Sequence, residues 1–547
     1  MFKIKNIMNK KKILVTCALP YANGSIHIGH LLEHIQADIW VRYHKINNRE
    51  IFFICADDSH GTPIMLKSKK MNINPKDLIR FIYNEHISDF LNFNISHDYY
   101  SSTDSKENFI LSKKFFLKLK KKGYILEKKI YQLYDIYKNI FLPDRLVKGK
   151  CPKCFKKNQY GDHCELCGSV YDAKDLINPK SELSNTSPIL KKSTHLFFDL
   201  PVFENKLKLW ISSGVLNKQI ENKIKEWFKY GLRKWDISRD SPYFGFEIPG
   251  YFKKYFYVWL DAPICYISTF KKLCKKNKNL FFNDFWKCSK KTKLYHFIGK
   301  DIIYFHSVFW PAFLEAIDFR KPNKIFVHGY VKFNKKKLSK SKNILITARS
   351  WLKYFDSDSL RYFFASKSSN SIKDINFNLE EFINLINSDI VNKIVNLASR
   401  CASFINKNFN GFLGNTLLDK DLYNRFFYKT KKINNFYKNR EFSLVVRNVI
   451  KYVNLANNYI DKNSPWKLSK INKYNKKIQL ICTMGINLFR VIITWLKPIM
   501  PDLSKRVENF LRKELFLKEL KKPLFKHKIL KFNHLYSRIP DSLKYVF

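Results

Sequence analysis

The chain has 547 residues, of which 45% are hydrophobic, so it can bury a large core and is not a disordered protein. Its length predicts about three domains. The 100 Lys and Arg residues outnumber 46 Asp and Glu, and the formal net charge of +54 indicates a polyanionic partner, most simply nucleic acid. The chain is also rich in Asn, Ile and Phe, so a compositional bias toward lysine accounts for part of the charge.

A membrane protein and an exported protein are both disfavoured. The most apolar window, 480–500, carries Asn487 and Arg490 in its middle, which predicts a buried helix and not a membrane span. The first twelve residues hold five lysines and no apolar stretch for export, so we expect a basic N-terminal extension over 1–12. Eleven cysteines without a signal peptide indicate a reducing compartment, and we expect a cytoplasmic protein.

The first predicted strand, 13–19, ends in a loop that opens a helix. The apolar spacing turns helical from Ile26, which places His27 and His30 in the first helical turn. Backbone N–H groups and the helix dipole favour an anion there, and imidazole donors beside them can bind phosphate. Gly29 leaves room for a flat base against the backbone. The alternative is two surface histidines with no ligand.

A second strand is predicted over 50–56, and polar residues follow it. Asp58 lies where ligands bind at the carboxyl ends of parallel strands, and it can pair with the ammonium group of an amino acid. The alternative is that Asp57 or Asp58 caps the next helix.

Four cysteines form two CxxC pairs separated by nine residues. Two such pairs that close on each other supply four thiolates in tetrahedral range, which predicts a structural zinc site with no open position. Disulfides or a redox CxxC remain alternatives, and His163 is a conceivable substitute ligand. The four ligands are Cys151, Cys154, Cys164 and Cys167.

Two later segments carry candidate amino-acid-binding residues. In the loop-rich stretch 231–249, Arg239 is a candidate partner for Asp58, or else a surface residue paired with Asp240. The stretch 255–266 predicts a strand that runs into a turn. A thioether pocket needs dispersion and sulfur–aromatic contacts, and aromatic side chains supply both. The candidate walls of such a pocket are Ala18, Leu19, Tyr21, Trp259 and Tyr266, with ordinary core aromatics as the alternative.

The strand predicted at 296–299 ends in glycine and an acid. Asp301 is placed to hold a pair of ribose hydroxyls. His306 begins a helical run and either faces the thioether pocket or is a satisfied core histidine. After a further short strand, 326–330, comes a lysine-rich run with Lys337 and Lys340, which by itself is typical of a solvated loop.

Beyond residue 378 the pattern changes to long helices. One apolar stripe leaves Asn396 and Arg400 on the opposite face, where they suit splayed bases. A second amphipathic helix, 442–460, ends before Trp466, which can stack on a base or anchor packing.

Two of these motifs carry a family resemblance. His27-Ile28-Gly29-His30 resembles the HIGH signature of class I aminoacyl-tRNA synthetases, and Lys337-Leu338-Ser339-Lys340-Ser341 resembles their KMSKS signature, with Leu338 in place of methionine. Together with the zinc knuckle and the aromatic segment, these motifs make the sequence similar to the methionyl branch over residues 13 to about 470. The resemblance implies an α/β fold. A Rossmann-like catalytic domain over 13–378 would carry an insertion at about 120–230 with the knuckle at 148–172, followed by an all-α anticodon-binding domain over 379–547.

The resemblance also implies the activity and its residues. Methionine is activated by ATP with Mg²⁺ to methionyl-adenylate and transferred to tRNA(Met), initiator and elongator, by a monomer. His27, His30, Lys337 and Lys340 are the implied catalytic residues, and Gly29, Gly299 and Asp301 complete the ATP site. The implied methionine site comprises Ala18, Leu19, Tyr21, Asp58, Arg239, Trp259, Ala262, Pro263, Tyr266 and His306, and the anticodon residues are Asn396, Arg400 and Trp466. Cys265 replaces the family's usual glycine after Pro263-Ile264.

Two rival interpretations remain. Leucyl, isoleucyl and valyl ligases carry a large editing domain for which 547 residues leave no room, and a cysteinyl ligase places zinc in its amino-acid site. From another class, an RNA-binding protein that has lost catalysis is disfavoured by the intact His27, His30, Lys337 and Lys340.

Overall fold

The computed structural model describes residues 11–547 except 162–163, 165, 168, 170, 288–290, 334–335, 338–344 and 471–473. Its centre is a five-stranded sheet in which every neighbouring pair is parallel. The strands, in spatial order, are β14 (Lys324–His328), β13 (Thr292–Gly299), β1 (Lys12–Cys17), β2 (Ile51–Asp57) and β3 (Tyr99–Ser102). The chain leaves β1 toward β2 on one side and has β13 on the other, so the switch point of the sheet lies at the end of β1.

Helices cover both faces of this sheet, which explains why its strands are buried and continuously apolar. Val15 and Phe53 pack with α2 and α4, whereas Leu14 and Ile54 point the other way and pack with α5, α8 and α10. The helices of this part are α2 (Ile28–Ile46), α3 (Thr62–Met71), α4 (Pro75–Asn92), α5 (Lys106–Lys121), α8 (Val258–Lys276), α9 (Phe282–Trp286) and α10 (Trp310–Ala316).

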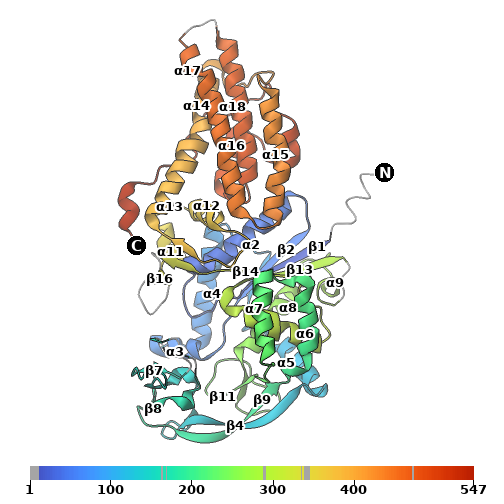
Figure 1. Ribbon diagram of the computed structural model, residues 1–547, viewed down its shortest axis with the longest axis vertical. Helices are drawn as coiled ribbons and strands as arrows, with labels where there is room; N and C mark the ends of the chain where they lie inside the picture. The colour runs from blue at the N-terminus through green and yellow to red at the C-terminus, as the bar shows by residue number, and fades with distance from the viewer. Residues whose placement is uncertain are drawn as a thin grey trace.

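An insertion between α5 and α8 forms the lower part of Figure 1. A long antiparallel pair, β4 (Ile125–Asp135) with β9 (Ile189–Phe198), carries at its far end a three-stranded sheet in the order β7-β6-β8. The remaining elements are β5 (Ile140–Phe141), β6 (Val147–Lys150), β7 (Gln159–Tyr160), β8 (Ile177–Ser181), α6 (Glu204–Trp210), α7 (Lys218–Lys229), β10 (Trp235–Asp236), β11 (Ser238–Asp240) and β12 (Lys254–Phe256).

The C-terminal part is a bundle of long helices that stands above the sheet in Figure 1. It is preceded by a small three-stranded sheet of β15 (Val331–Phe333), β16 (Lys336–Lys337) and β17 (Ile375–Phe377). The helices are α11 (Ala348–Leu352), α12 (Ser357–Lys367), α13 (Leu379–Ile386), α14 (Asn396–Phe409), α15 (Lys420–Lys438), α16 (Phe442–Asn463), α17 (Pro465–Leu468), α18 (Asn475–Leu496) and α19 (Pro501–Leu511), with a π-helical segment Asn387–Val395 before α14.

Helix α18 is the centre of this bundle. It is the one helix among the described residues that is long and apolar enough to cross a membrane, but 89% of its most apolar window is buried inside the protein. Its Arg490 is also buried, and its Nη1 and Nη2 donate to the carbonyl groups of Lys522 and Glu519 within the fold. The prediction of a core helix over this stretch is confirmed.

A buried arginine joins the bundle to the sheet. Arg361 on α12 pairs with Asp38 on α2 at 2.7 Å and donates to the carbonyl groups of Pro498 and Ile499 after α18. Because both charges are fully buried, removing either partner would leave an unpaired charge in the core. The sheet and the bundle are therefore locked together through α2.

The observed α/β sheet with a helical C-terminal part confirms the predicted fold class, but some local predictions are wrong. The stretch 255–266 is a strand only at its start, where β12 ends at Phe256, and the predicted turn is instead a helix that starts at Val258 and contains Pro263. Its aromatic composition suggested a strand, whereas residues 260–270 are buried all round the helix, so no exposed polar face marks the helical period. Neither Asp57 nor Asp58 caps α3, whose N-cap is Gly61.

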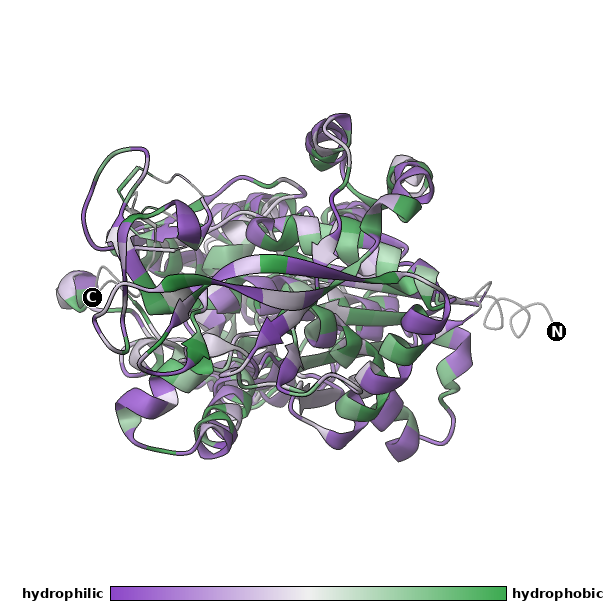
Figure 2. Cartoon of the chain, turned by 90° about the horizontal axis from the view of Figure 1, so that it is seen from below, coloured by the Kyte–Doolittle hydropathy of each residue, from purple (hydrophilic) through white to green (hydrophobic). Residues whose placement is uncertain are grey.

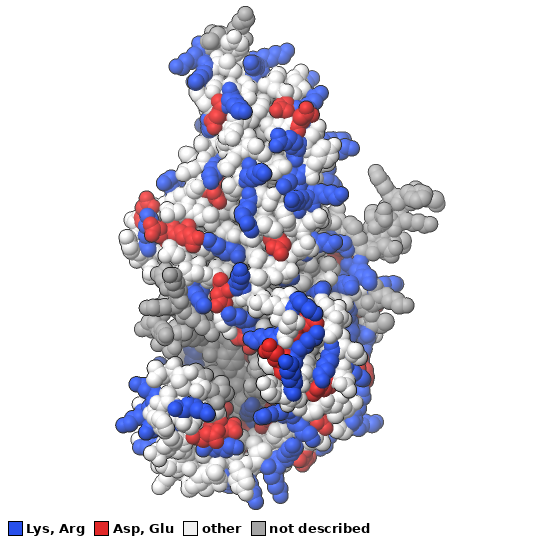
Figure 3. All heavy atoms as spheres, in the orientation of Figure 1, with Lys and Arg blue, Asp and Glu red and all other residues white. Residues whose placement is uncertain are grey.

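The surface agrees with the composition. Seen from below, the outer turns and helices are largely hydrophilic, while hydrophobic residues gather on the elements inside (Figure 2). On the face in Figure 3, Lys and Arg side chains spread over the bundle and the lower part, and acidic side chains form smaller groups between them. This face therefore offers a broad cationic surface.

Candidate functional site

The two histidines of the first loop lie at the start of α2. His27 is the N-cap of the helix and not part of its first turn, and His30 is the third helical residue. The rings stack with their centroids 3.7 Å apart. Nδ1 of His27 accepts from the backbone N–H of Gly29 at 3.1 Å, and Nδ1 of His30 faces the N–H of His27 at 3.4 Å. Because both Nδ1 atoms are acceptors, each neutral ring carries its proton on Nε2, where it is a donor.

Gly29 is required for this arrangement. A Cβ atom built at Gly29 would lie 2.9 Å from Cε1 and 3.0 Å from Nδ1 of His27, closer than van der Waals contact allows. The sequence pointed to a base lying against Gly29, whereas the structure shows in addition that glycine makes room for the imidazole of the helix cap.

The lysine-rich segment ends against the same loop. The N–H of Ile28 donates to the carbonyl of Ile346 at 3.0 Å, and the N–H of Ala348 donates to the carbonyl of Ile26 at 2.8 Å. The segment 334–344 therefore connects β15 to residues paired with the histidine motif. The backbone of Lys337 lies in β16, but its side chain, and the whole of Lys340, Leu338 and Ser341, lie outside the described residues.

The ends of β13 and β14 form another part of the cleft wall. Gly299 and Asp301 both line the cleft, and a Cβ atom at Gly299 would lie 2.6 Å from Oδ1 of Asp301. Next to them is a buried pair that the sequence did not reveal. Oε1 of Glu33 accepts from the N–H of Ala18 at 2.6 Å, and Oε2 lies 3.1 Å from Nε2 of His328.

This buried pair fixes the groups around the switch point. Nδ1 of His328 faces the carbonyl of Gly329 at 2.7 Å, so both ring nitrogens meet acceptors. Burial alone would lower the pKa of His328, but the facing Glu33 carboxylate raises it. The pair thus ties the ends of β1 and β14 to α2. Helix α2 carries Glu33 two turns after His27, and only the fold reveals its contact with β14.

Asp58 lies at the end of β2 beside the first loop. Its N–H donates to the carbonyl of Pro20 at 2.9 Å, and the N–H of Ala22 donates back to its carbonyl at 2.8 Å. Oδ1 of its carboxyl group is buried and has no hydrogen-bond partner among the described residues. Burial, and then the nearby Asp261, raise the pKa of Asp58 well above its usual range. A cation placed here would satisfy that oxygen and restore the charged form.

Asp58 has charged neighbours that the sequence did not single out. His60 lies between Asp261 and Asp104, with Nδ1 bonded to the first and Nε2 3.5 Å from the second. Burial would lower the pKa of His60, but the two carboxylates raise it to about 10. Nearby, His86 joins Asp57 at 2.7 Å to the carbonyl of Gly24 at 2.8 Å, which fastens the first loop to the end of β2.

An aromatic wall closes the other side of Asp58. Trp259 on α8 stacks on Phe305 with ring centroids 3.7 Å apart. Nδ1 of His306 faces the carbonyl of Ile302 at 3.2 Å, so its Nε2 accepts from the Tyr266 hydroxyl at 2.9 Å. Burial lowers the pKa of His306 to about 4, which leaves the ring neutral near pH 7. His306 is thus a satisfied core histidine that also lines the cleft. This wall is apolar and uncharged.

Arg239 approaches the cleft from β11. Its guanidinium lies over the ring of Tyr257, with Cζ 3.8 Å from the ring centroid, and Nη1 is 3.6 Å from Oδ2 of Asp236. Neither pairing expected from the sequence, with Asp58 or with Asp240, is made among the described residues. Asp236 was missed because it lies three residues earlier, on β10.

These groups share one cleft of about 1280 Å³ at the carboxyl ends of the sheet strands. Residues 130–133, 141–144 and 172–174 of the insertion form part of its rim. The fold brings together all described residues that the sequence assigned to the ATP and methionine sites. They are Ala18, Leu19, Tyr21, His27, Gly29, His30, Asp58, Arg239, Trp259, Ala262, Pro263, Tyr266, Gly299, Asp301 and His306.

The four cysteines of the insertion form a separate group. Sγ of Cys151 is 3.8 Å from that of Cys167, Sγ of Cys154 is 3.4 Å from that of Cys164, and all four lie within 4.8 Å of one another. These distances exceed the S–S bond length of about 2.0 Å, which excludes disulfides. A tetrahedral ion with bonds of about 2.3 Å separates its sulfurs by about 3.8 Å. The group could therefore hold a metal ion.

The candidate anticodon residues lie at the far end of the bundle, near α17 in Figure 1. The Arg400 guanidinium lies over the ring of Trp466, 4.4 Å from its centroid, and pairs with Asp461 at 2.6 Å. Asn396 is exposed one helical turn before Arg400. Trp466 also packs partly against the core of the bundle. The fold thus joins two of the three residues directly and leaves the third on the same face.

A parallel sheet with a ligand cleft at its switch point places the chain among the Rossmann-like nucleotide-binding proteins. A family model described as tRNA synthetases class I (M) matches residues 13–402. The chain is 60% identical to the methionine–tRNA ligase of Buchnera aphidicola subsp. Schizaphis graminum over 529 residues, 97% of both chains. It is 56% identical to that of Buchnera aphidicola subsp. Baizongia pistaciae over 533 residues, 97% of this chain and 98% of the relative.

Solved structures share the fold. Mycobacterium tuberculosis methionyl-tRNA synthetase bound by methionyl-adenylate superposes with a TM-score of 0.79 at 20% identity, over 96% of this chain and 100% of that one. Together with the match of the family model, the identity to the relatives shows that this chain belongs to the class I tRNA synthetases, in their methionine branch.

Proposed function

We propose that the chain is a methionine–tRNA ligase that activates L-methionine with ATP and transfers it to tRNA(Met), initiator and elongator. The observation that carries the proposal is the buried Oδ1 of Asp58, which has no partner among the residues that the structure describes, in the cleft that also holds the Nε2 donors of His27 and His30. An amino acid held by its ammonium group at Asp58 has its carboxylate directed along the same cleft toward a bound nucleotide.

The first step needs no protein nucleophile. The methionine carboxylate attacks the α-phosphorus of ATP and pyrophosphate leaves, so catalysis consists of positioning and charge stabilisation. Nε2–H of His27 and of His30 donate to the phosphates, and Gly299 and Asp301 receive the ribose. Lys337 and Lys340 balance the charge of the leaving pyrophosphate. Pairing of Ile346 and Ala348 with the histidine loop supports their proximity.

The methionine side chain is recognised by shape and dispersion. Trp259, Tyr266 and the neutral His306, together with Ala18, Leu19, Tyr21, Ala262 and Pro263, offer a thioether an apolar pocket without charge. Because the Tyr266 hydroxyl already donates to His306, it is not a donor for a polar side chain. Branched or charged amino acids are disfavoured.

In the second step, the ribose hydroxyl at the tRNA end attacks the activated carbonyl and AMP leaves. Asn396, Arg400 and Trp466 read the anticodon at the far end of the bundle, where arginine and tryptophan can stack on unpaired bases. The cationic surface in Figure 3 suits the RNA backbone between the two sites. The chain acts as a monomer in the cytoplasm.

The four cysteines hold one structural Zn²⁺, since four soft donors with tetrahedral spacing leave no position for a substrate. The ion orders the insertion, whose residues form the rim of the cleft. Mg²⁺ accompanies the ATP phosphates. Metal analysis of the purified chain should find one zinc per molecule, and Cys154→Ser should lose it; a zinc content unchanged by that substitution would contradict the assignment.

Methionine-dependent exchange of labelled pyrophosphate into ATP tests the proposed activity. The zinc-loaded chain should catalyse exchange with methionine and far less with leucine or isoleucine. Absence of exchange would favour a non-catalytic RNA-binding protein. Lys340→Ala should lower the rate of adenylate formation much more than it weakens methionine binding, and a loss of methionine affinity alone would refute the role given to that lysine.

A further inference from the structure

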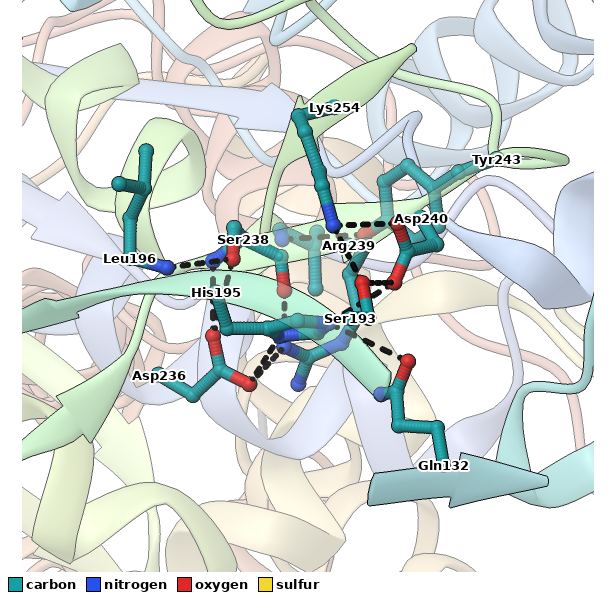
Figure 4. Close-up of polar contacts among 11 residues, drawn as sticks. Gln132, Ser193, His195, Leu196, Asp236, Ser238, Arg239, Asp240, Tyr243 and Lys254 are labelled. Atoms are coloured by element: carbon teal, nitrogen blue, oxygen red, sulfur yellow. Dashed lines mark hydrogen bonds and ion pairs between the residues drawn. The ribbon is translucent and has the colours of Figure 1, made fainter. Parts of the chain in front are cut away.

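A buried histidine joins several charged side chains on the insertion side of the cleft (Figure 4). His195 lies on β9 with none of its surface exposed. Its Nδ1 is 2.7 Å from Oδ2 of Asp236, and its Nε2 is 2.8 Å from Oδ2 of Asp240. Nε2 also lies 3.2 Å from Oε1 of Gln132. Since both ring nitrogens face carboxylates, both carry protons and the ring is an imidazolium.

The two carboxylates lie on either side of Arg239 in the chain. Oδ2 of Asp236 also faces Nη1 of Arg239 at 3.6 Å, and its Oδ1 accepts from the N–H of Ser238 at 3.1 Å. Asp240 accepts from Oγ of Ser193 at 2.8 Å and pairs with Lys254. The cluster therefore holds three cations and two carboxylates drawn from β9, β10, β11 and β12.

Arg239 is held between these contacts and the cleft. Its Nη1 donates to the carbonyl of the preceding residue, Ser238, at 2.6 Å, and its guanidinium lies over the ring of Tyr257. Arg239 and Tyr257 both line the cleft, whereas His195 does not. The direction of the Arg239 side chain thus depends on how the short segment 236–240 is fixed, and one imidazolium binds both ends of that segment.

We propose that His195 is a positioning residue for methionine binding: it clips Asp236 to Asp240 and so holds Arg239 over Tyr257 at the methionine end of the cleft. The inference rests on the proposed function, because it takes Arg239 as part of the methionine site. A neutral or missing ring at 195 leaves Asp236 and Asp240 without their shared cation. Repulsion then opens the segment and frees Arg239.

The clip also gives methionine binding a distinctive pH dependence. Burial would lower the pKa of His195, but Asp236 and Asp240 raise it above its usual value. The other charged groups that face the cluster are Arg239 and Lys254. The KM for methionine should therefore rise only above the pH at which an ordinary histidine titrates, where His195 loses its proton.

Asp240→Asn removes one of the two carboxylates at nearly constant shape. The alkaline rise in the KM for methionine should then begin at least about one pH unit lower, since an adjacent carboxylate shifts a pKa by about 1–3 units. A residue that only supported the fold would change the melting temperature and leave this pH profile in place.

The direct test is His195→Gln in the full-length chain. We expect the KM for methionine in pyrophosphate exchange, and the calorimetric Kd for methionine without ATP, to rise about tenfold or more, in line with a lost charge-assisted contact. The KM for ATP should stay within a factor of about two. His527→Gln is the matched control, because the one hydrogen bond of His527 within the described part of the chain is to a backbone carbonyl, that of Leu511 at 2.6 Å.

Unchanged methionine constants in His195→Gln, or equal rises for methionine and ATP, would overturn the inference. If His195→Gln does not fold, Asp240→Asn is the deciding variant. An unchanged pH dependence of its KM for methionine would then overturn the inference. The two proposals fail differently. A wild-type chain that binds methionine but catalyses no exchange defeats the proposed function, whereas an active wild type with an indistinguishable His195→Gln defeats only the role of His195.

Discussion

At the end of the cleft that we propose binds phosphate, two imidazoles one helical turn apart are oriented by N–H groups of their own segment. At the proposed methionine end, the loop with Asp58 and His60 lies far from Arg239 in the chain, and His60 and Arg239 are held by charged neighbours. The first end is a local structure that its own segment largely specifies. The second exists only after the sheet, α8 and the insertion have assembled.

This difference predicts where each end is vulnerable. Substitutions at the phosphate end should slow chemistry and leave methionine binding intact, because we propose that the Nε2 donors bind the phosphates. Substitutions at the methionine end should weaken methionine binding, and some should also alter the stability and its pH dependence. The following substitutions test this difference between the two ends, in order of decreasing expected effect.

Asp58→Asn should have the largest effect. It removes the charge that receives the ammonium group, and truncating one partner of a buried, hydrogen-bonded charge pair costs about 2–5 kcal/mol, so kcat/KM for methionine should fall by about 10³. Pyrophosphate exchange measures the loss. The KM for ATP should change little, and Asp77→Asn, on the surface of α4 in an exposed ion pair, is the control. Near-normal methionine constants would show that the ammonium group binds elsewhere.

His27→Asn should lower kcat for exchange by about 10²-fold, the order expected for one lost hydrogen-bond donor to a charged transition state. Asparagine keeps a helix-capping side chain, so the fold should be retained. The calorimetric Kd for methionine should remain as in wild type, and the exposed His534→Asn serves as control. A weakened Kd for methionine with kcat unaffected would erase the contrast between the two ends.

Trp466→Ala tests a region that should be independent of both ends of the cleft. Loss of stacking on one base costs about 1–3 kcal/mol, so the KM for tRNA(Met) in aminoacylation should rise about tenfold. Pyrophosphate exchange without tRNA should be unchanged. Tyr428→Ala, on the exposed face of α15, is the matched bundle control. An unchanged KM for tRNA would leave Trp466 as a packing residue.

The smallest expected effect is a change in how thermal stability depends on pH. His60 has a pKa of about 10 in the folded chain and an ordinary value of about 6.5 when unfolded. Its contribution to stability is therefore complete below about pH 6.5 and is lost as the pH rises toward 10. Melting temperatures from pH 6.5 to 10 should fall more steeply in wild type than in His60→Gln. If the melting temperatures of the two proteins fell in parallel, groups other than His60 would be responsible for the loss of stability.

The same contrast explains what the sequence could reveal. A strand, a glycine-containing loop and two histidines in one segment were enough to predict a phosphate site, and the paired CxxC spacing was enough to predict the group of four cysteines. The aromatic run at 255–266 was misassigned because strand propensity and a buried helix face use the same residues. Glu33, His328 and His195 were missed, since each acts through a partner more than 40 residues away, which only the fold brings into contact.

The central claim is that both ends of the cleft hold their substrates at the same time. The zinc-loaded chain, mixed with methionine, ATP–Mg²⁺ and pyrophosphatase in the absence of tRNA, can be quenched and its adenylate quantified by mass spectrometry. We predict close to one methionyl-adenylate per chain, and almost none with Asp58→Asn. Folded wild-type protein that binds methionine and ATP separately but forms no adenylate would contradict the account.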